Sequence, residues 1–260
     1  MKKDDSKKKF SAHQKSAPRD EERYVGGRNA AAEAIAANLA TRLFVKKGAW
    51  DERLREMISL AKEHGVAIEE KDAKALDAMV PDLRHQGVVA EILPYQYHDL
   101  DAVLSDWEGR DPFLILLDGV EDVRNLGAII RTAECAGAAA VLIPEHRSAR
   151  VTYATMKTAA GACAYLPVCR IGNIRQTLET LKDKGFWVVG TAMDGESNYF
   201  EANLTGPLVI VMGAEGKGMS PLTRKTCDFC VRIPMKGRTE SLKVSVAAAL
   251  LLFEAAKQRG

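Results

Sequence analysis

The fold is indicated most directly by residues 112–143, which read PFLILLDGVEDVRNLGAIIRTAECAGAAAVLI. The continuous apolar run Phe113–Leu117 is typical of a strand that is covered on both faces. A helix is expected over Leu126–Ala136, and Gly137 is placed to end it in a left-handed conformation. Ala139–Ile143 predicts the next strand. A strand, a helix and a strand in this order predict two parallel strands joined by a crossover.

The same alternation continues toward the C-terminus. Further strands are expected at Ala164–Cys169, Phe186–Thr191, Leu208–Met212 and Cys230–Ile233. Helices are expected at Ile174–Lys184 and Val244–Lys257. The last helix places an apolar stripe on one face, made of Val244, Ala248, Leu251, Leu252 and Ala255. We therefore expect an α/β domain over residues 112–260, with a mostly parallel sheet that helices cover on both faces.

A smaller α/β domain is expected upstream, over residues 24–95. Its predicted helices lie at Ala30–Ala40 and Asp51–His64. An apolar run lies at Leu43–Val45, and Val88–Ile92 is expected to form a strand. A polar, Asp-rich linker over residues 96–111 joins the two domains. Residues 1–23 carry eight Lys and Arg against five Asp and Glu with few apolar residues, which indicates a disordered basic tail. A solvated tail and an arm that touches phosphates both fit this composition.

Composition excludes several classes of protein. The chain has 260 residues, 47% of them apolar, which is enough for two domains that each bury a core. No apolar run is long enough to span a bilayer, and the N-terminus has no secretory apolar region. The five cysteines are odd in number and all lie in the second half. This spacing does not fit a disulfide framework, so we expect a protein of the reducing cytoplasm.

The glycine-rich turns do not match common nucleotide-binding motifs. Residues 118–127, DGVEDVRNLG, lack the G-x-G-x-x-G pattern of a dinucleotide site. Residues 213–220, GAEGKGMS, are not a Walker A loop, because the Lys is followed by Gly. Cys227 and Cys230 form half of a metal or redox motif that no second pair completes, and no two histidines have ligand spacing. We therefore expect structural cysteines and no metal.

Three segments taken together resemble the three motifs of the SpoU (TrmH) family of SPOUT methyltransferases. They are residues 117–133 (LDGVEDVRNLGAIIRTA), 211–219 (VMGAEGKGM) and 233–247 (IPMKGRTESLKVSVA). The closest likeness is to bacterial enzymes that methylate a guanosine 2′-hydroxyl in large-subunit rRNA. It covers nearly all of residues 112–260 and extends more weakly to HQGVVA at residues 85–90.

This resemblance implies a fold, a cofactor and partners. The catalytic domain would contain a C-terminal trefoil knot and form a homodimer, with the site at the knot and the subunit interface. S-adenosylmethionine would lie bent in the knot, held largely by backbone groups, and would contact Gly213, Ile233 and Leu242. The N-terminal domain would bind RNA in the manner of a ribosomal-protein-like module. The reaction implied is 2′-O-methylation of a ribose in large-subunit rRNA, without a metal.

The resemblance also assigns the catalytic positions to Asn125, Arg131, Glu215, Ser241 and Lys243. Methyl transfer to a ribose oxygen is an in-line displacement, which needs aligned atoms and a route for the hydroxyl proton. We expect Arg131 to bind the neighbouring phosphate through its planar fork. Asn125 and Glu215 would hold Arg131 and the ribose, and Ser241 would shape the same pocket.

The residues by themselves leave alternatives open. Asn125 could cap a helix, Arg131 could be an exposed helix residue, and Glu215 could be a solvated turn residue. Ser241 could cap the last helix. Lys243 departs from the Asn that is usual in the family, and Lys offers only donors, so it could contact a phosphate or the hydroxyl.

Two other functions fit the same residues. The chain could methylate tRNA or another rRNA site, although the additional N-terminal domain favours rRNA. It could instead be an RNA-binding paralogue that lost turnover at Lys243, although the other four motif residues are retained.

Overall fold

The computed structural model describes residues 20–260, except residues 49 and 82–83. The chain divides into two compact units that meet in sequence between Gln96 and Tyr97. Most of the expected tail, residues 1–19, lies outside the described residues. Its last four residues form helix α1, Asp20–Arg23, in which Arg23 pairs with Glu91 at 2.7 Å. These four residues are helical in the structure, and the tail over residues 1–23 stays a prediction.

The N-terminal unit is a four-stranded sheet in the order β1-β4-β2-β3. Its strands are β1 (Tyr24–Gly26), β2 (Ala40–Lys46), β3 (Ala67–Lys71) and β4 (Val88–Ile92). Its helices are α2 (Arg28–Ala36), α3 (Glu52–Glu63) and α4 (Ala73–Met79). The helix expected over Ala30–Ala40 ends earlier, because Asn38 adopts a left-handed conformation and Ala40 already enters β2. Strand β3 reads AIEEK, which has too few apolar residues for sequence patterning to reveal it.

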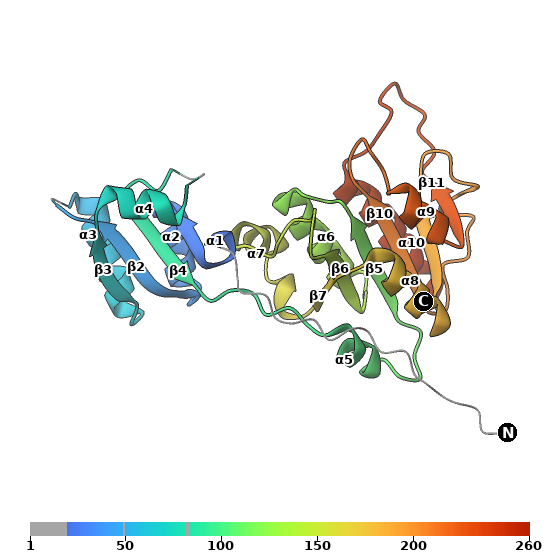
Figure 1. Ribbon diagram of the computed structural model, residues 1–260, viewed down its shortest axis with the longest axis horizontal. Helices are drawn as coiled ribbons and strands as arrows, with labels where there is room; N and C mark the ends of the chain where they lie inside the picture. Colours follow the sequence, from blue (N-terminus) through green and yellow to red (C-terminus); the bar gives the residue numbers. More distant parts are fainter. Residues whose placement is uncertain (1–19, 49, 82–83) are drawn as a thin grey trace. The chain divides into compact units, whose positions relative to one another are not determined.

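The C-terminal unit contains a seven-stranded sheet in the order β7-β6-β5-β10-β8-β11-β9, in which every described pair is parallel (Figure 1). Its strands are β5 (Phe113–Asp118), β6 (Ala140–Pro144), β7 (Val168–Ile171), β8 (Trp187–Thr191), β9 (Ser197–Asn198), β10 (Leu208–Gly213) and β11 (Phe229–Arg232). Its helices are α5 (Leu100–Ser105), α6 (Val123–Cys135), α7 (Tyr153–Ala159), α8 (Ile174–Asp183), α9 (Pro221–Thr226) and α10 (Val244–Arg259). The predicted parallel sheet is confirmed. No helix in the described part of the chain is long and apolar enough to cross a membrane.

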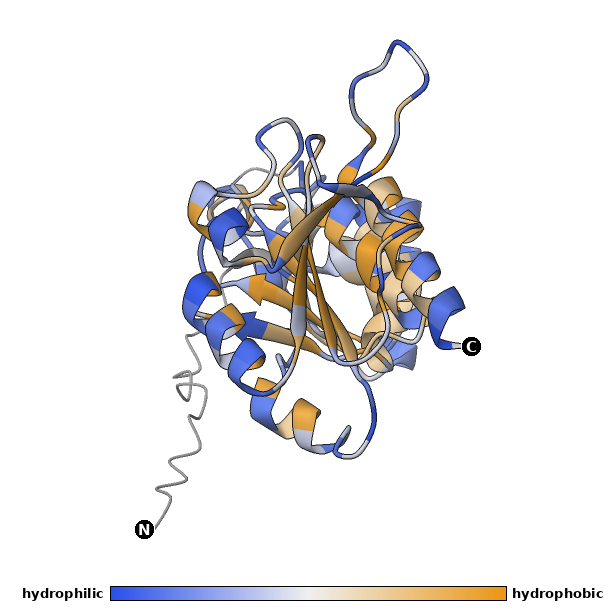
Figure 2. Cartoon of the chain, turned by 90° about the vertical axis from the view of Figure 1, so that its right-hand side faces the viewer, coloured by the Kyte–Doolittle hydropathy of each residue, from blue (hydrophilic) through white to orange (hydrophobic). Residues whose placement is uncertain are grey.

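Both faces of this sheet are covered by helices, as the unbroken apolar strands predict. Leu114 and Leu116 pack with side chains of α5 and α8 on one face. Ile115 and Leu117 point to the opposite face, where α6 and α10 pack against each other (Figure 2). The stripe predicted on the last helix is confirmed, since all five of its residues are buried.

Two further predicted boundaries, both in the C-terminal unit, are wrong for local reasons. The strand expected over Ala164–Cys169 begins only at Val168, because Ala162–Ala164 form a turn of 3-10 helix (η1). Helix α6 begins at Val123 rather than Leu126, because the Asp122 carboxylate accepts hydrogen bonds from the first backbone amides. The strand order does not test the trefoil knot, which stays a prediction.

Candidate functional site

The site lies where the chain leaves neighbouring strands in opposite directions. Strands β5 and β10 are adjacent, and the chain continues from β5 to β6 on one side and from β10 to β11 on the other. Open parallel sheets bind ligands at the carboxyl ends of strands at such a switch point. The loops after the two strands are tied together, because the Asp118 carboxylate accepts a hydrogen bond from the Ser220 amide at 2.8 Å. This edge of the sheet, where the two loops are hydrogen-bonded to each other, is therefore the candidate site.

The loop after β10 turns back tightly on itself. The backbone groups of Ala214 and Gly218 exchange hydrogen bonds of 2.8 and 3.1 Å. This pairing presses the backbone of Gly218 against Gly213, where an added Cβ would overlap the carbonyl carbon. Only glycine fits at position 213, because the backbone of Gly218 and Met219 fills the space of a Cβ and so closes the loop tightly.

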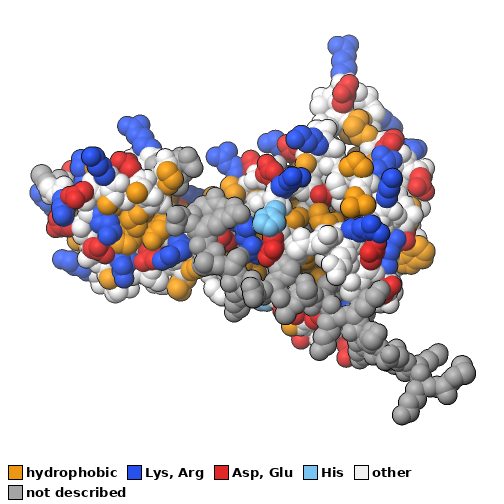
Figure 3. Space-filling view, viewed as in Figure 1, with side chains coloured by type: hydrophobic (Ala, Val, Ile, Leu, Met, Phe, Trp, Pro, Cys, Tyr) orange, Lys and Arg blue, Asp and Glu red, His pale blue; other side chains and the backbone are white. Residues whose placement is uncertain are grey.

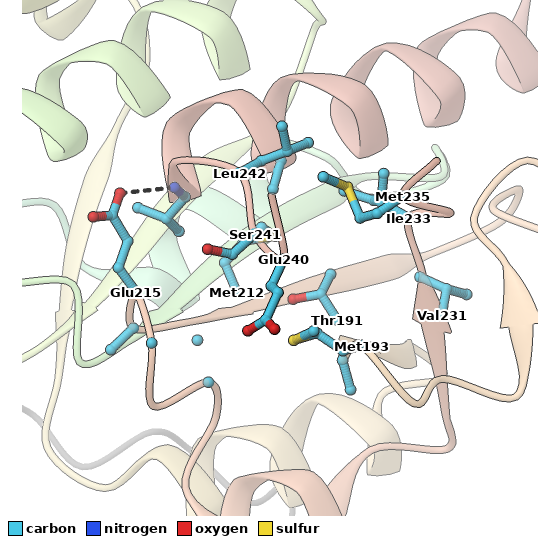
Figure 4. A pocket seen from close by; sticks show the side chains of 17 residues that line it. Thr191, Met193, Met212, Glu215, Val231, Ile233, Met235, Glu240, Ser241 and Leu242 are labelled. Atoms are coloured by element: carbon cyan, nitrogen blue, oxygen red, sulfur yellow. Dashed lines mark hydrogen bonds between the residues drawn. The ribbon is translucent and has the colours of Figure 1, made fainter. Parts of the chain in front are cut away.

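A pocket opens beside this loop (Figure 4). The three residues predicted to contact the cofactor, Gly213, Ile233 and Leu242, line it together with Glu215 and Ser241. Most of the other side chains that line it are apolar: Ala192, Met193, Met212, Val231, Met235, Val244 and Ala247. The charged residues in its lining are two carboxylates, Glu215 and Glu240. Such a pocket suits a ligand that combines an apolar body with positive charge.

Glu215 joins the first turns of two helices. Its Oε1 accepts a hydrogen bond from Asn125 Nδ2 in α6 at 3.1 Å and another from the Val244 amide in α10 at 3.0 Å. The second of these bonds is the dashed line in Figure 4. On its other side, Asn125 Oδ1 accepts a hydrogen bond from Ser245 Oγ at 3.0 Å. The carboxylate therefore satisfies an orphan amide of α10 and faces the positive end of its dipole.

This geometry decides between the alternative roles of three residues. Asn125 does not cap α6, because Asp122 does and Asn125 lies inside the helix. Glu215 is more than a solvated turn residue, because it makes both bonds described above. Ser241 does not cap α10, since the cap position is Lys243, whose side chain makes no capping bond.

Arg131 and Lys243 do not line the pocket. Arg131 lies six residues beyond Asn125 in α6, so the two side chains point about 120° apart around the helix. Both Arg131 and Lys243 are exposed, and neither side chain makes a hydrogen bond or ion pair with the described residues. The expected contact of Asn125 and Glu215 with Arg131 is therefore not found, because those two residues bond to each other instead.

Several residues of the site were not singled out from the sequence. Ser245 belongs to the third motif segment and lies in the first turn of α10. Its place in that segment was the feature of the sequence that could have identified it. Glu240 and Met193 line the pocket from loops, where no periodicity marks them. Cys227 and Cys230 are free thiols. Burial raises the pKa of Cys227 to about 12, so this pair does not provide a nucleophile at neutral pH. No cluster of three or more potential metal ligands occurs among the described residues.

Comparison with known proteins gives consistent results for both units. The sequence profile of the SpoU rRNA Methylase family matches residues 112–253, and a profile described as RNA 2′-O ribose methyltransferase substrate binding matches residues 24–98. The chain is 45% identical to the 23S rRNA (guanosine-2′-O-)-methyltransferase RlmB of Photobacterium profundum, over 87% of this chain and 95% of the relative. It is 46% identical to the RlmB of Pseudomonas syringae pv. tomato, over 84% and 87% of the two chains.

A solved structure supports the fold. The SpoU methyltransferase AviRb from Streptomyces viridochromogenes, crystallised with its cofactor AdoMet, superposes with a TM-score of 0.60. The match covers 90% of this chain and 89% of AviRb at 23% sequence identity. Since the SpoU rRNA Methylase profile alone matches more than half of its residues, the chain belongs to the SpoU rRNA Methylase family.

Proposed function

We propose that the protein transfers a methyl group from S-adenosylmethionine to the 2′-hydroxyl of a guanosine ribose in 23S rRNA. The observation that carries this proposal is that the second and third motif segments line one pocket, and that the first segment is hydrogen-bonded to the pocket residue Glu215. Asn125 comes from the first segment, Gly213 and Glu215 from the second, and Ile233, Ser241 and Leu242 from the third. The names of the similar RlmB proteins support guanosine and large-subunit rRNA as the target.

The pocket fits S-adenosylmethionine on structural grounds. Gly213 brings bare backbone to the pocket, and Ile233 and Leu242 offer apolar surface for a base. Glu215 and Glu240 place negative charge beside a cationic ligand. When bound, S-adenosylmethionine supplies an electrophilic methyl group on a positively charged sulfur. The AdoMet complex of AviRb supports this choice of cofactor.

The Asn125–Glu215 role is proposed from its position, whereas the roles of Arg131, Ser241 and Lys243 are proposed from the family motifs. The Asn125–Glu215 link holds the first turn of α6 against the first turn of α10 and so fixes the wall of the pocket. Arg131 binds the phosphate next to the target ribose through its planar fork, and that phosphate accepts the hydroxyl proton. Ser241 shapes the pocket on the RNA side, and Lys243 contacts the RNA backbone at the start of α10.

The proposed organisation has an RNA-binding domain over residues 24–95, a linker over residues 96–111 and a methyltransferase domain over residues 112–260. The match of the substrate-binding profile to residues 24–98 supports the first of these. A basic tail over residues 1–23 adds charge in front of them. The target RNA implies that the protein works in the cytoplasm.

A homodimer built on α10 is part of the proposal, as is the trefoil knot. Besides its buried stripe, α10 exposes Val246, Leu250 and Phe253, with Phe253 52% exposed. These residues follow one another at intervals of four and three, so they form a second apolar stripe on one side of the helix. A second copy of the chain would cover this stripe and bring its own α10 to the same interface.

The test uses the purified protein, tritiated S-adenosylmethionine and transcripts of bacterial 23S rRNA, 16S rRNA and tRNA. We expect label only in 23S rRNA, released on complete digestion as 2′-O-methylguanosine. Label in tRNA instead would move the activity to a different RNA. Tight RNA binding without any label would favour a non-catalytic paralogue and would contradict the proposal.

A further inference from the structure

The Lys and Arg side chains of the C-terminal unit fall into two groups. Some are paired within their own helix: Arg175 pairs with Glu179 in α8 at 2.7 Å, and Lys257 pairs with Glu254 in α10 at 3.2 Å. Others make no hydrogen bond or ion pair with any described residue. These are Arg124, Arg131, Arg147, Lys217, Lys225, Lys236, Arg238 and Lys243. Uncompensated cations are available for an anionic partner, because binding it breaks no internal pair.

Lys236, Arg238 and Lys243 stand together on one segment, Pro234–Lys243, between β11 and α10. Figures 1 and 2 show this connection projecting from the domain, and Figure 3 shows Lys or Arg side chains at its tip. Every residue from Pro234 to Ser241 is exposed, so the segment packs on no core of its own. Its length is therefore not explained by the stability of the fold.

Both ends of this segment are attached to the pocket. Met235 lines the pocket at one end, and Glu240, Ser241 and Leu242 line it at the other. Lys236 and Arg238 lie within three residues of Met235, and each residue spans at most about 3.6 Å. Their charges are consequently held within reach of any RNA strand whose ribose enters the pocket.

We propose that the segment Pro234–Lys243 is a clamp for the RNA backbone, in which Lys236 and Arg238 bind phosphates beside the target nucleotide. This inference rests on the proposed function, because it assumes an RNA substrate at the pocket. Phosphate fits better than a carboxylate-bearing protein partner, since Lys236 and Arg238 are separated only by Gly237, with no apolar side chain between them. Both side chains are positioning residues, and they contact the strand rather than the reacting atoms.

The test compares two double variants that lose the same charge. Lys236→Ala/Arg238→Ala removes the proposed contacts. The control, Arg175→Ala/Lys257→Ala, removes two cations that are paired within α8 and α10. The readouts are the affinity for a 23S rRNA transcript at several salt concentrations, the affinity for S-adenosylmethionine, and kcat and KM for the RNA.

We expect the first variant to bind RNA roughly 10- to 30-fold more weakly at 0.15 M salt, with a salt slope smaller by about 1.4 to 1.8. KM for RNA should rise in parallel, while kcat and cofactor affinity stay within about twofold. The control should change none of these by more than about twofold. The charge-preserving variant Lys236→Arg/Arg238→Lys should show the same dependence of RNA affinity on salt as the unmodified protein.

An unchanged salt slope, or an equal loss in the control, would overturn the clamp. A loss of cofactor affinity instead would assign the two cations to the cofactor. Because RNA binding needs no turnover, these outcomes remain distinct from a failure of the proposed methyl transfer itself.

Discussion

Glu215 offers the sharpest test of the site, because one oxygen atom holds two elements together. Glu215→Ala removes the acceptor for the Val244 amide and for Asn125 Nδ2. Loss of a helix cap costs about 1 kcal/mol, and loss of an exposed side-chain hydrogen bond costs about 0.5–1 kcal/mol. Water replaces part of both bonds, since Glu215 is exposed, so the free energy of unfolding should fall by about 1–2 kcal/mol. The melting temperature should therefore fall by about 2–8 °C.

The same substitution should reduce methyl transfer far more than stability. Without Glu215, Asn125 and the Val244 amide lose the acceptor that they share. A displacement of reacting groups by about 1 Å can lower the rate by about 100-fold. Thermal unfolding and kcat/KM on rRNA measure the two effects separately. Glu215→Gln should retain part of both, because an amide oxygen still accepts hydrogen bonds from the same donors but without the negative charge.

Asn173→Ala provides the matched control. Asn173 caps α8 by accepting a hydrogen bond from the Gln176 amide at 3.0 Å, and it lies outside the pocket. We expect a similar loss of about 1 kcal/mol in stability with activity retained. If Glu215→Ala lost no more activity than Asn173→Ala, the positioning role of Glu215 would be refuted.

Five further outcomes are expected from the structure. Arg131→Ala should abolish turnover with cofactor affinity within about twofold by calorimetry, and Arg131→Lys should rescue little because a point charge lacks the fork. Gly213→Ala should abolish cofactor binding in the same assay, because its Cβ would overlap the Gly218 backbone. Phe253→Asp should give a monomer by light scattering, whereas a persistent dimer would exclude this face as the interface. Alkylation at pH 8, followed by mass spectrometry, should label the exposed Cys135 before Cys227. Because the pKa of Cys227 is about 12, only a fraction on the order of 10⁻⁴ of this residue is thiolate at that pH. Equal labelling rates of the two residues would contradict this. Burial likewise raises the pKa of Cys169 to about 12 from 9.0, so stability should fall as the pH rises above about 9 and these thiols ionise first in the unfolded chain.

Local pattern was sufficient for the strongly buried elements of both units. Strand Val88–Ile92 of the N-terminal unit and the buried stripe of α10 in the C-terminal unit have the predicted residues, because burial imposes a period that the sequence carries directly. The short strand β3 was missed because its sequence, AIEEK, does not alternate between apolar and polar residues, as a strand with one buried face would. The strand expected at Ala164 was misplaced because alanine and cysteine are compatible with the 3-10 turn found there.

The candidate site could be described only from the sequence and the tertiary structure together. Sequence by itself determined which segments carry polar groups, since the three motifs were recognisable before any contact was known. Only the tertiary structure decided that Glu215 bonds to Asn125, 90 residues away in the chain, and caps α10. The same packing directs Arg131 away from both residues, because a helix turns about 100° per residue and its axis is set by its neighbours. Periodicity shows which residues are buried, whereas the direction of an exposed polar side chain depends on how the helices and loops around it pack.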